Sequence, residues 1–310
     1  ARSRGRGDVY KRQGDAVDMA SMIGVPLDAV DVKRHASQDL LDEYVWQDLM
    51  GSLRSGYYSG VFMSPPCSTF SPVRCVPGGP GPIRGNEDPQ IFGLPGISAE
   101  DREKCRKGTL LAHRCADVAD YCDEIGMPWA AAAPLIRASF PSAFKLPRWL
   151  EIRARETTVQ ADFEQCKMKD LVARDVSRTY KKSTTLLGNV DFREFATAHR
   201  CDHPRMEWVR PSDGHSVFAP HPPLRGTERY VPGKRHTGVM SSASDEPEYL
   251  TGATAYYPAE LTWQLIGRLT AESCKWILKQ PNASKPLPLP ETQTPVDFSG
   301  RPKVQQRNPL

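Results

Sequence analysis

The sequence predicts an α/β fold, and two observations lead to that prediction. Short apolar, β-prone segments alternate along the chain with longer segments in which apolar residues recur at helical spacing. One β-prone segment, residues 57–63, is stopped by Pro65 and Pro66 and is followed directly by Cys67. A thiol just beyond the end of a strand lies where open α/β sheets place their chemistry.

The individual elements follow from periodicity and from start and stop residues. Helices are predicted over residues 14–24, 40–54, 98–126 and 258–279, and Ser98 and Gly126 bound the third of them. Strands with their terminal turns are predicted over residues 27–32, 57–63, 126–134, 157–166 and 180–189. Residues 72–96 contain six prolines and six glycines, which predicts a long flexible loop after Cys67.

Composition limits the classes of protein to be considered. The net charge of +4 permits a nucleic-acid partner without requiring one. No apolar run approaches the roughly 18 residues that span a bilayer, and no signal-peptide core follows the N-terminus. The eight cysteines include no Cys-x-x-Cys pair, which favours reduced thiols. We therefore expect a soluble, intracellular protein, nuclear or cytoplasmic and monomeric.

The segment around Cys67 resembles a family motif. Residues 65–71, Pro-Pro-Cys-Ser-Thr-Phe-Ser, are similar to the Pro-Pro-Cys-(Gln or Gly)-x-Phe-Ser motif of the DNA cytosine-5 methyltransferases, in the divergent form found in mobile elements and viruses. In that family the cysteine attacks C6 of a flipped cytosine, and S-adenosylmethionine supplies the methyl group. The resemblance implies a three-layer, Rossmann-like methyltransferase fold with Cys67 and Pro66 as catalytic residues. The alternative is a buried cysteine in a proline-rich turn.

The same resemblance suggests cofactor-binding residues. Asp31, at the end of the predicted strand 27–32, would hold the ribose hydroxyls of S-adenosylmethionine, Asp39 would lie near its adenine, and Pro65 would border it. A turn residue and a helix cap are the alternatives for the two aspartates. The family's first strand and glycine-rich loop do not precede residue 14, so we expect the sheet to lack its first strand.

A further family motif is altered here. Relatives have Trp-x-x-Glu-Asn-Pro where this chain has Trp129-Ala-Ala-Ala-Ala-Pro134, so Ala132 stands at the position of the glutamate and Ala133 at that of the asparagine. The family glutamate acts at cytosine N3. Because losing a positioned general acid costs about 10²–10⁴-fold in rate, we expect impaired activity.

Several residues are candidates for contact with nucleic acid. By the same resemblance, the loop over residues 72–96 would close over the flipped base. The candidates lie beside Cys67, in that loop and in the strand predicted near residue 180: Ser68, Arg74, Arg84, Lys181, Lys182 and Thr184. Solvated loop arginines and an edge strand with solvated lysines are the alternatives.

The segment from His199 to His203 is the only cluster of soft metal ligands that the sequence shows. Alternation along an extended chain would place His199, Cys201 and His203 on one face, with His215 or His221 as possible additions. Zinc needs about four ligands and no second cysteine pair follows, so the sequence interpretation assigns no metal. It assigns the cysteines of the 98–126 helix to core packing.

The chain divides into five parts: a linker-like basic segment, 1–13; the methyltransferase-like domain, 14–203; an irregular insertion, 204–248; a returning motif and helix, 249–280; and a proline-rich disordered tail, 281–310. The interpretation is a DNA cytosine-5 methyltransferase-like protein that is impaired or inactive. The alternatives are a non-catalytic nucleic-acid-binding remnant of a mobile element, and an unrelated thiol enzyme that pairs Cys67 with a distant histidine.

Overall fold

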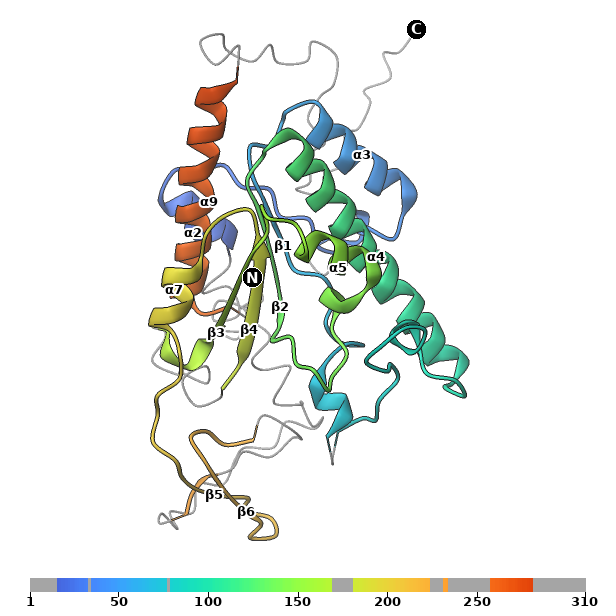
Figure 1. Ribbon diagram of the computed structural model, residues 1–310, viewed down its shortest axis with the longest axis vertical. Helices are drawn as coiled ribbons and strands as arrows, with labels where there is room; N and C mark the ends of the chain where they lie inside the picture. Colours follow the sequence, from blue (N-terminus) through green and yellow to red (C-terminus); the bar gives the residue numbers. More distant parts are fainter. Residues whose placement is uncertain are drawn as a thin grey trace, which may run out of the picture.

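The computed structural model describes residues 16–32, 35–76, 79–168, 181–223, 231–233 and 257–280, and the helices and strands named here lie within these residues (Figure 1). Its helices are α2 (Ala16–Met22), α3 (Glu43–Arg54), α4 (Ala99–Ile125), α5 (Pro147–Arg153), α7 (Arg193–Ala198) and α9 (Ala259–Lys279). Its strands are β1 (Val61–Met63), β2 (Trp129–Pro134), β3 (Val159–Glu164), β4 (Ser183–Gly188), β5 (Met206–Val209), β6 (Ser216–Ala219) and β7 (Val231–Pro232).

The strands form two sheets. The first has four strands in the order β1-β2-β4-β3, and the second has three strands in the order β6-β5-β7. In the first sheet β1 and β2 are parallel, whereas β4 runs antiparallel to both of its neighbours. The α/β class is therefore correct, and the first sheet is of mixed type.

Helices cover both faces of the four-stranded sheet. Figure 1 shows α3, α4 and α5 on one side and α2, α7 and α9 on the other. Strand β2 is enclosed between them, since Ala131 and Ala133 belong to one apolar cluster and Ala130 and Ala132 to the other. Because alanine side chains are small, the helices on both faces can pack closely against β2. Gly188 of β4 is required by the close approach of the neighbouring backbone, because a Cβ there would meet the Trp129 carbonyl oxygen at 2.3 Å.

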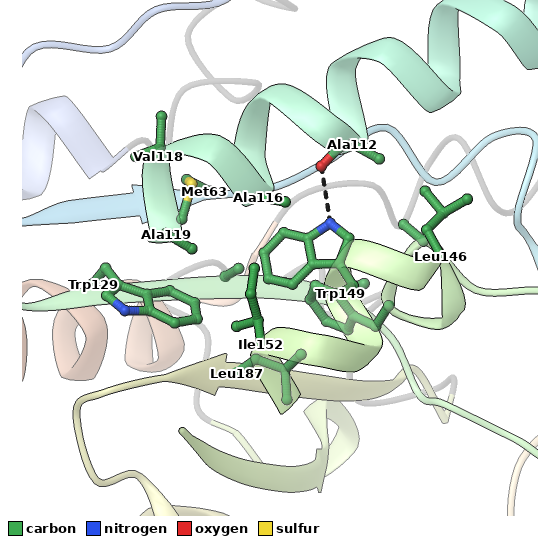
Figure 2. Close-up of a cluster of buried hydrophobic side chains, with 14 of the residues drawn as sticks. Met63, Ala112, Ala116, Val118, Ala119, Trp129, Leu146, Trp149, Ile152 and Leu187 are labelled. Carbon is green, nitrogen blue, oxygen red and sulfur yellow. Dashed lines mark hydrogen bonds between the residues drawn. The ribbon is translucent and has the colours of Figure 1, made fainter. Parts of the chain in front are cut away.

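Two tryptophans form the centre of the cluster beneath α4 and α5. Both Trp129 and Trp149 are fully buried, with ring centroids 6.2 Å apart, and Figure 2 shows them between these helices and the sheet. The Trp149 indole N–H donates a hydrogen bond of 2.9 Å to the Ala112 carbonyl of α4. The large apolar rings are therefore buried without leaving their polar atom unsatisfied.

Helix α4 begins and ends where the sequence predicts. The Ser98 hydroxyl accepts a hydrogen bond of 3.0 Å from the Asp101 N–H, and Gly126 ends the helix with φ of +68°. Cys105 and Cys122 are buried, and burial raises the pKa of Cys115 to about 12. These thiols are packed against apolar groups, as predicted, and their protonated form is favoured.

Helix α9 packs against the opposite face of the sheet. Leu261, Leu265 and Leu269 are buried there, as their spacing predicts. Near the other end of α9, the Trp276 indole N–H donates to the Ile125 carbonyl at 3.0 Å. This hydrogen bond joins the returning helix to the last turn of α4.

Three expectations from the sequence differ from the structure. Residues 27–32 form no strand, and the part of 204–248 that is described contains β5, β6 and β7 rather than irregular chain. The loop 72–96 contains two short 3-10 turns, Pro72–Cys75 and Gln90–Phe92, and buries Ile83 and Ile91. The segments 1–13 and 281–310 and the start of the returning motif, 249–256, lie outside the described residues.

Among the helices of the described residues, none combines the length and the apolar character that a membrane crossing needs.

Candidate functional site

Cys67 is exposed on a short loop whose neighbours are fixed. Strand β1 ends at Met63, and the loop that follows buries Pro65 on one side of the cysteine and Phe70 on the other. The Phe70 N–H donates to the Cys67 carbonyl at 3.0 Å, which closes a tight turn. Because both flanks of the turn are anchored in the core, the thiol is presented to solvent in a defined place. The alternative of a buried cysteine in a proline-rich turn is therefore wrong.

Two side chains from distant parts of the chain lie beside this loop. The hydroxyls of Ser64 and Tyr257 are 3.0 Å apart, and the Lys182 ammonium lies 5.5 Å from the centre of the Tyr257 ring. Phe62 of β1 packs edge-on against the same ring, with centroids 5.9 Å apart. Lys182 precedes β4 and Tyr257 precedes α9, so three segments of the chain converge here.

The surroundings shift the protonation of both side chains. Burial lowers the pKa of Lys182 to about 8, and the nearby Cys67 sulfur partly offsets that shift. Burial also raises the pKa of Tyr257 to about 12, with Cys67 adding to the increase and the Ser64 hydrogen bond opposing it. A lysine that titrates near pH 8 can both support a thiolate and exchange a proton close to neutral pH.

Thr184 and Lys181, the other two candidates near Lys182, contact protein side chains. Thr184 is buried and its hydroxyl accepts a hydrogen bond of 2.9 Å from the Gln165 side chain. The Lys181 ammonium lies 3.4 Å from the Glu164 carboxylate. Strand β4 is also an interior strand, between β2 and β3, and not the edge strand considered from the sequence.

Ala132 lies inside the sheet. It is 0% exposed and belongs to the apolar cluster that contains Leu186 and Leu261. Its pairing partner in β4 is Leu186, and the preceding Ala131 pairs with Met63, the last residue of β1. The position at which the resemblance would place a glutamate therefore lies near the carboxyl end of the parallel pair but carries no polar group.

The structure gives Arg84 a role that the sequence interpretation did not foresee. Arg84 is 2% exposed, and its guanidinium lies 3.8 Å above the Phe70 ring. It donates hydrogen bonds to two carbonyls and two hydroxyls, namely those of Ile91, Cys105, Thr69 and Thr109. Burial lowers its pKa to about 10. Arg84 therefore ties the 72–96 loop to α4 and to the Cys67 turn instead of facing a phosphate.

Ser68 and Arg74 remain candidates for contact with nucleic acid. Ser68 is exposed directly after Cys67, and Arg74 is half-buried in the 3-10 turn that follows. Among the residues that the structure describes, the buried Arg74 Nε atom has no hydrogen-bond partner. A cationic N–H that lacks a protein acceptor is suited to an anionic oxygen.

The two aspartates proposed for the cofactor have local hydrogen bonds. The Asp39 carboxylate accepts a hydrogen bond of 2.9 Å from the Leu41 N–H, in the turn that leads to α3. Asp42, not Asp39, is the cap of α3. The Asp31 N–H donates to the Gln38 side chain at 3.2 Å, and no strand ends at Asp31.

A second cluster of reactive groups lies just beyond the carboxyl end of β3. One ligand atom from each of four side chains falls within 4.8 Å of the others: Cys166, Cys201, His203 and His221. His199 is used elsewhere, since its ring nitrogens lie 2.7 Å from the Phe195 carbonyl and 3.1 Å from the Glu260 carboxylate. The sequence interpretation had grouped His199 with Cys201 and His203 and assigned no metal to them.

Sequence reasoning missed one residue at each site: Tyr257 beside Cys67, and Cys166 in the group of two cysteines and two histidines. Tyr257 was noted only within the returning motif, and Cys166 only at the end of a strand. No local pattern connects Tyr257 with Cys67 or Cys166 with Cys201, because in both cases the segments meet only when the sheet forms.

Comparisons of the chain with protein-family models, with curated proteins and with solved structures found no match.

Proposed function

We propose that the chain is a DNA cytosine-5 methyltransferase-like protein in which Cys67 is the nucleophile toward cytosine and in which methyl transfer from S-adenosylmethionine is impaired. The observation that carries the proposal is the display of the Cys67 thiol at the carboxyl end of the parallel pair β1 and β2, beside Lys182. Open α/β sheets bind their ligands at this edge.

The chemistry required of Cys67 fits its surroundings. Its thiolate would add to C6 of an extruded cytosine, forming the S–C6 bond while the C5=C6 electron pair moves to C5. Carbon C5 would then take the methyl group as its bond to the sulfonium sulfur breaks and S-adenosylhomocysteine leaves. Loss of the C5 proton to water would restore the C5=C6 bond and expel the cysteine thiolate. An ammonium beside the sulfur favours the thiolate that begins this sequence.

The impairment has a structural basis in Ala132. The addition requires a proton or hydrogen-bond donor at cytosine N3, and Ala132 is fully enclosed among apolar groups. Without that donor the addition is slower by about 10²–10⁴-fold. Lys182 is a cationic group near the thiol that could compensate in part.

The same enclosure of Ala132 favours a second candidate, a non-catalytic domain that binds nucleic acid. In that case Ser68, Arg74 and Lys182 would contact a nucleic-acid strand and no covalent bond would form. DNA binding that is unchanged in the Cys67→Ser variant, together with the absence of any adduct, would favour this candidate.

Trapping of a covalent complex tests the proposal. The full chain is incubated with S-adenosylmethionine and DNA that contains 5-fluorocytosine, because fluorine at C5 cannot leave as a proton does and the adduct then persists. We expect a slow, cofactor-dependent adduct at Cys67 in the natural chain and none in Cys67→Ser. Absence of the adduct from the natural chain would contradict catalysis.

A further inference from the structure

The cluster at the end of β3 has the donor set of a structural zinc site. It combines two thiols and two imidazoles, with ligand atoms all within 4.8 Å of one another. Two thiolates and two imidazoles in tetrahedral arrangement are typical of structural zinc, whereas hard cations such as Mg²⁺ and Ca²⁺ prefer oxygen ligands.

The distances from the Cys201 sulfur to the two imidazoles fit tetrahedral zinc closely. With Zn–S near 2.3 Å and Zn–N near 2.0 Å, a tetrahedron places a sulfur and a nitrogen ligand about 3.5 Å apart. The Cys201 sulfur lies 3.5 Å from His203 Nδ1 and 3.2 Å from His221 Nε2. The two imidazole rings are 4.8 Å apart and inclined at 78°, so that they approach the sulfur from different directions.

The backbone around the cluster is held in place by hydrogen bonds between its two main segments. The Cys201 N–H donates to the Glu164 carboxylate at 3.1 Å, and the Glu164 N–H donates to the His199 carbonyl at 3.0 Å. An ion pair of 2.5 Å between Lys167 and Asp202 joins the residues that follow each cysteine. Such contacts around the ligands orient them before a metal binds.

Burial in the hairpin is confined to the cluster. Within residues 201–223 the buried residues are His221 and Pro222, and no residue of β5 or β6 is buried. Phe218 of β6 is 63% exposed, so the hairpin has little apolar core. A small antiparallel sheet of this kind is marginal in water unless something else holds it.

We propose that one structural zinc ion binds the four side chains at the end of β3: Cys166, Cys201, His203 and His221. The ion joins segments on both sides of the hairpin to the 3-10 turn Gln165–Lys167, and so fastens the three-stranded sheet to the four-stranded one. Four protein ligands close the coordination sphere, which makes the role structural and not catalytic. This inference does not depend on the function proposed for Cys67.

Metal analysis of the full chain tests the proposal. The natural chain, refolded with zinc and freed of loosely bound metal, is expected to hold about one zinc per chain. Cys166→Ser and Cys201→Ser are expected to lose most of it, whereas the control variants Cys274→Ser and His215→Ala retain it. Absence of zinc from the natural chain, or full retention in Cys166→Ser, would overturn the proposal.

Cobalt substitution provides a readout that needs no variant and therefore does not depend on whether a variant folds. Co²⁺ bound by two thiolates and two imidazoles in a tetrahedron gives intense visible bands and a sulfur-to-cobalt charge-transfer band. We expect both in the natural chain. The weak spectrum of six-coordinate, oxygen-bound cobalt would contradict the assignment.

Discussion

The two sheets of this protein are stabilised in different ways. Strands β2 and β4 of the four-stranded sheet are almost wholly buried between two helical layers, whereas β5 and β6 of the three-stranded sheet contain no buried residue. Apolar burial holds the first sheet. The second has its buried residues at the Cys/His cluster, so its position depends on what that cluster binds. The chemistry proposed for Cys67 and the metal site proposed at Cys201 thus use different residues.

Two tryptophans test this difference most strongly. Trp149→Ala is expected to lower the free energy of unfolding by about 3–5 kcal/mol, because the variant leaves a cavity in the core under α4. Trp208→Ala, in β5, is expected to cost about 1 kcal/mol or less, because Trp208 is only half-buried. Urea unfolding followed by circular dichroism measures both. Equal losses would show that the second sheet has a core of its own.

The next largest effect is expected at Arg84, which joins the Cys67 turn to α4. Arg84→Met is expected to lower the free energy of unfolding by about 1–3 kcal/mol, because it leaves buried carbonyls and hydroxyls without their donor. Arg74→Met, in the same loop, serves as the matched control and is expected to alter DNA binding more than stability. If Arg84→Met instead weakened DNA binding with unchanged stability, the structural role assigned here would be wrong.

Thiol labelling separates the two cysteine sites within one sample. Iodoacetamide is expected to modify Cys67 at the same rate with or without a chelator, because Cys67 is exposed and is not part of the metal cluster. Cys201 is expected to react at least about tenfold faster after zinc is removed. Mass spectrometry of the peptides gives both rates. Identical rates at Cys201 would argue against a bound metal.

The smallest expected effect concerns pH. Below the Lys182 pKa of about 8 the ammonium is charged and interacts with the Cys67 sulfur, and above it that interaction is lost. Lys182→Met is therefore expected to slow alkylation of Cys67 roughly fivefold near pH 7 and to leave it unchanged near pH 9.5. Lys181→Met, whose side chain faces Glu164, is the control. A constant difference across this pH range would exclude the charge as its cause.

The sequence predicted best what depends on local periodicity. The bounds of α4 and α9 follow from apolar spacing and from Ser98 and Gly126, and β2 and β4 lie within the segments expected. The strand predicted at residues 27–32 does not form. The prediction failed because alternation over six residues is a weak signal unless a partner strand is known. The insertion after residue 204 was expected to be irregular because short exposed strands lack an apolar pattern.

The candidate sites were predicted only in part, for a related reason. Cys67 was identified because its loop has a local motif. Lys182 was identified because its segment resembles one of the methyltransferase family. The burial of Arg84 and the pairing of Cys166 with Cys201 are tertiary properties. Each joins residues that are far apart in the chain, and the register of the sheet decides which of them meet.

Hydrogen exchange of the full chain, with zinc and after its removal, tests most directly whether the two sheets are held by different means. We predict that amides of β5 and β6 lose protection when zinc is removed, while those of β2 and β4 keep theirs. Equal protection of β5 and β6 in both samples, or a parallel loss in β2 and β4, would contradict the account.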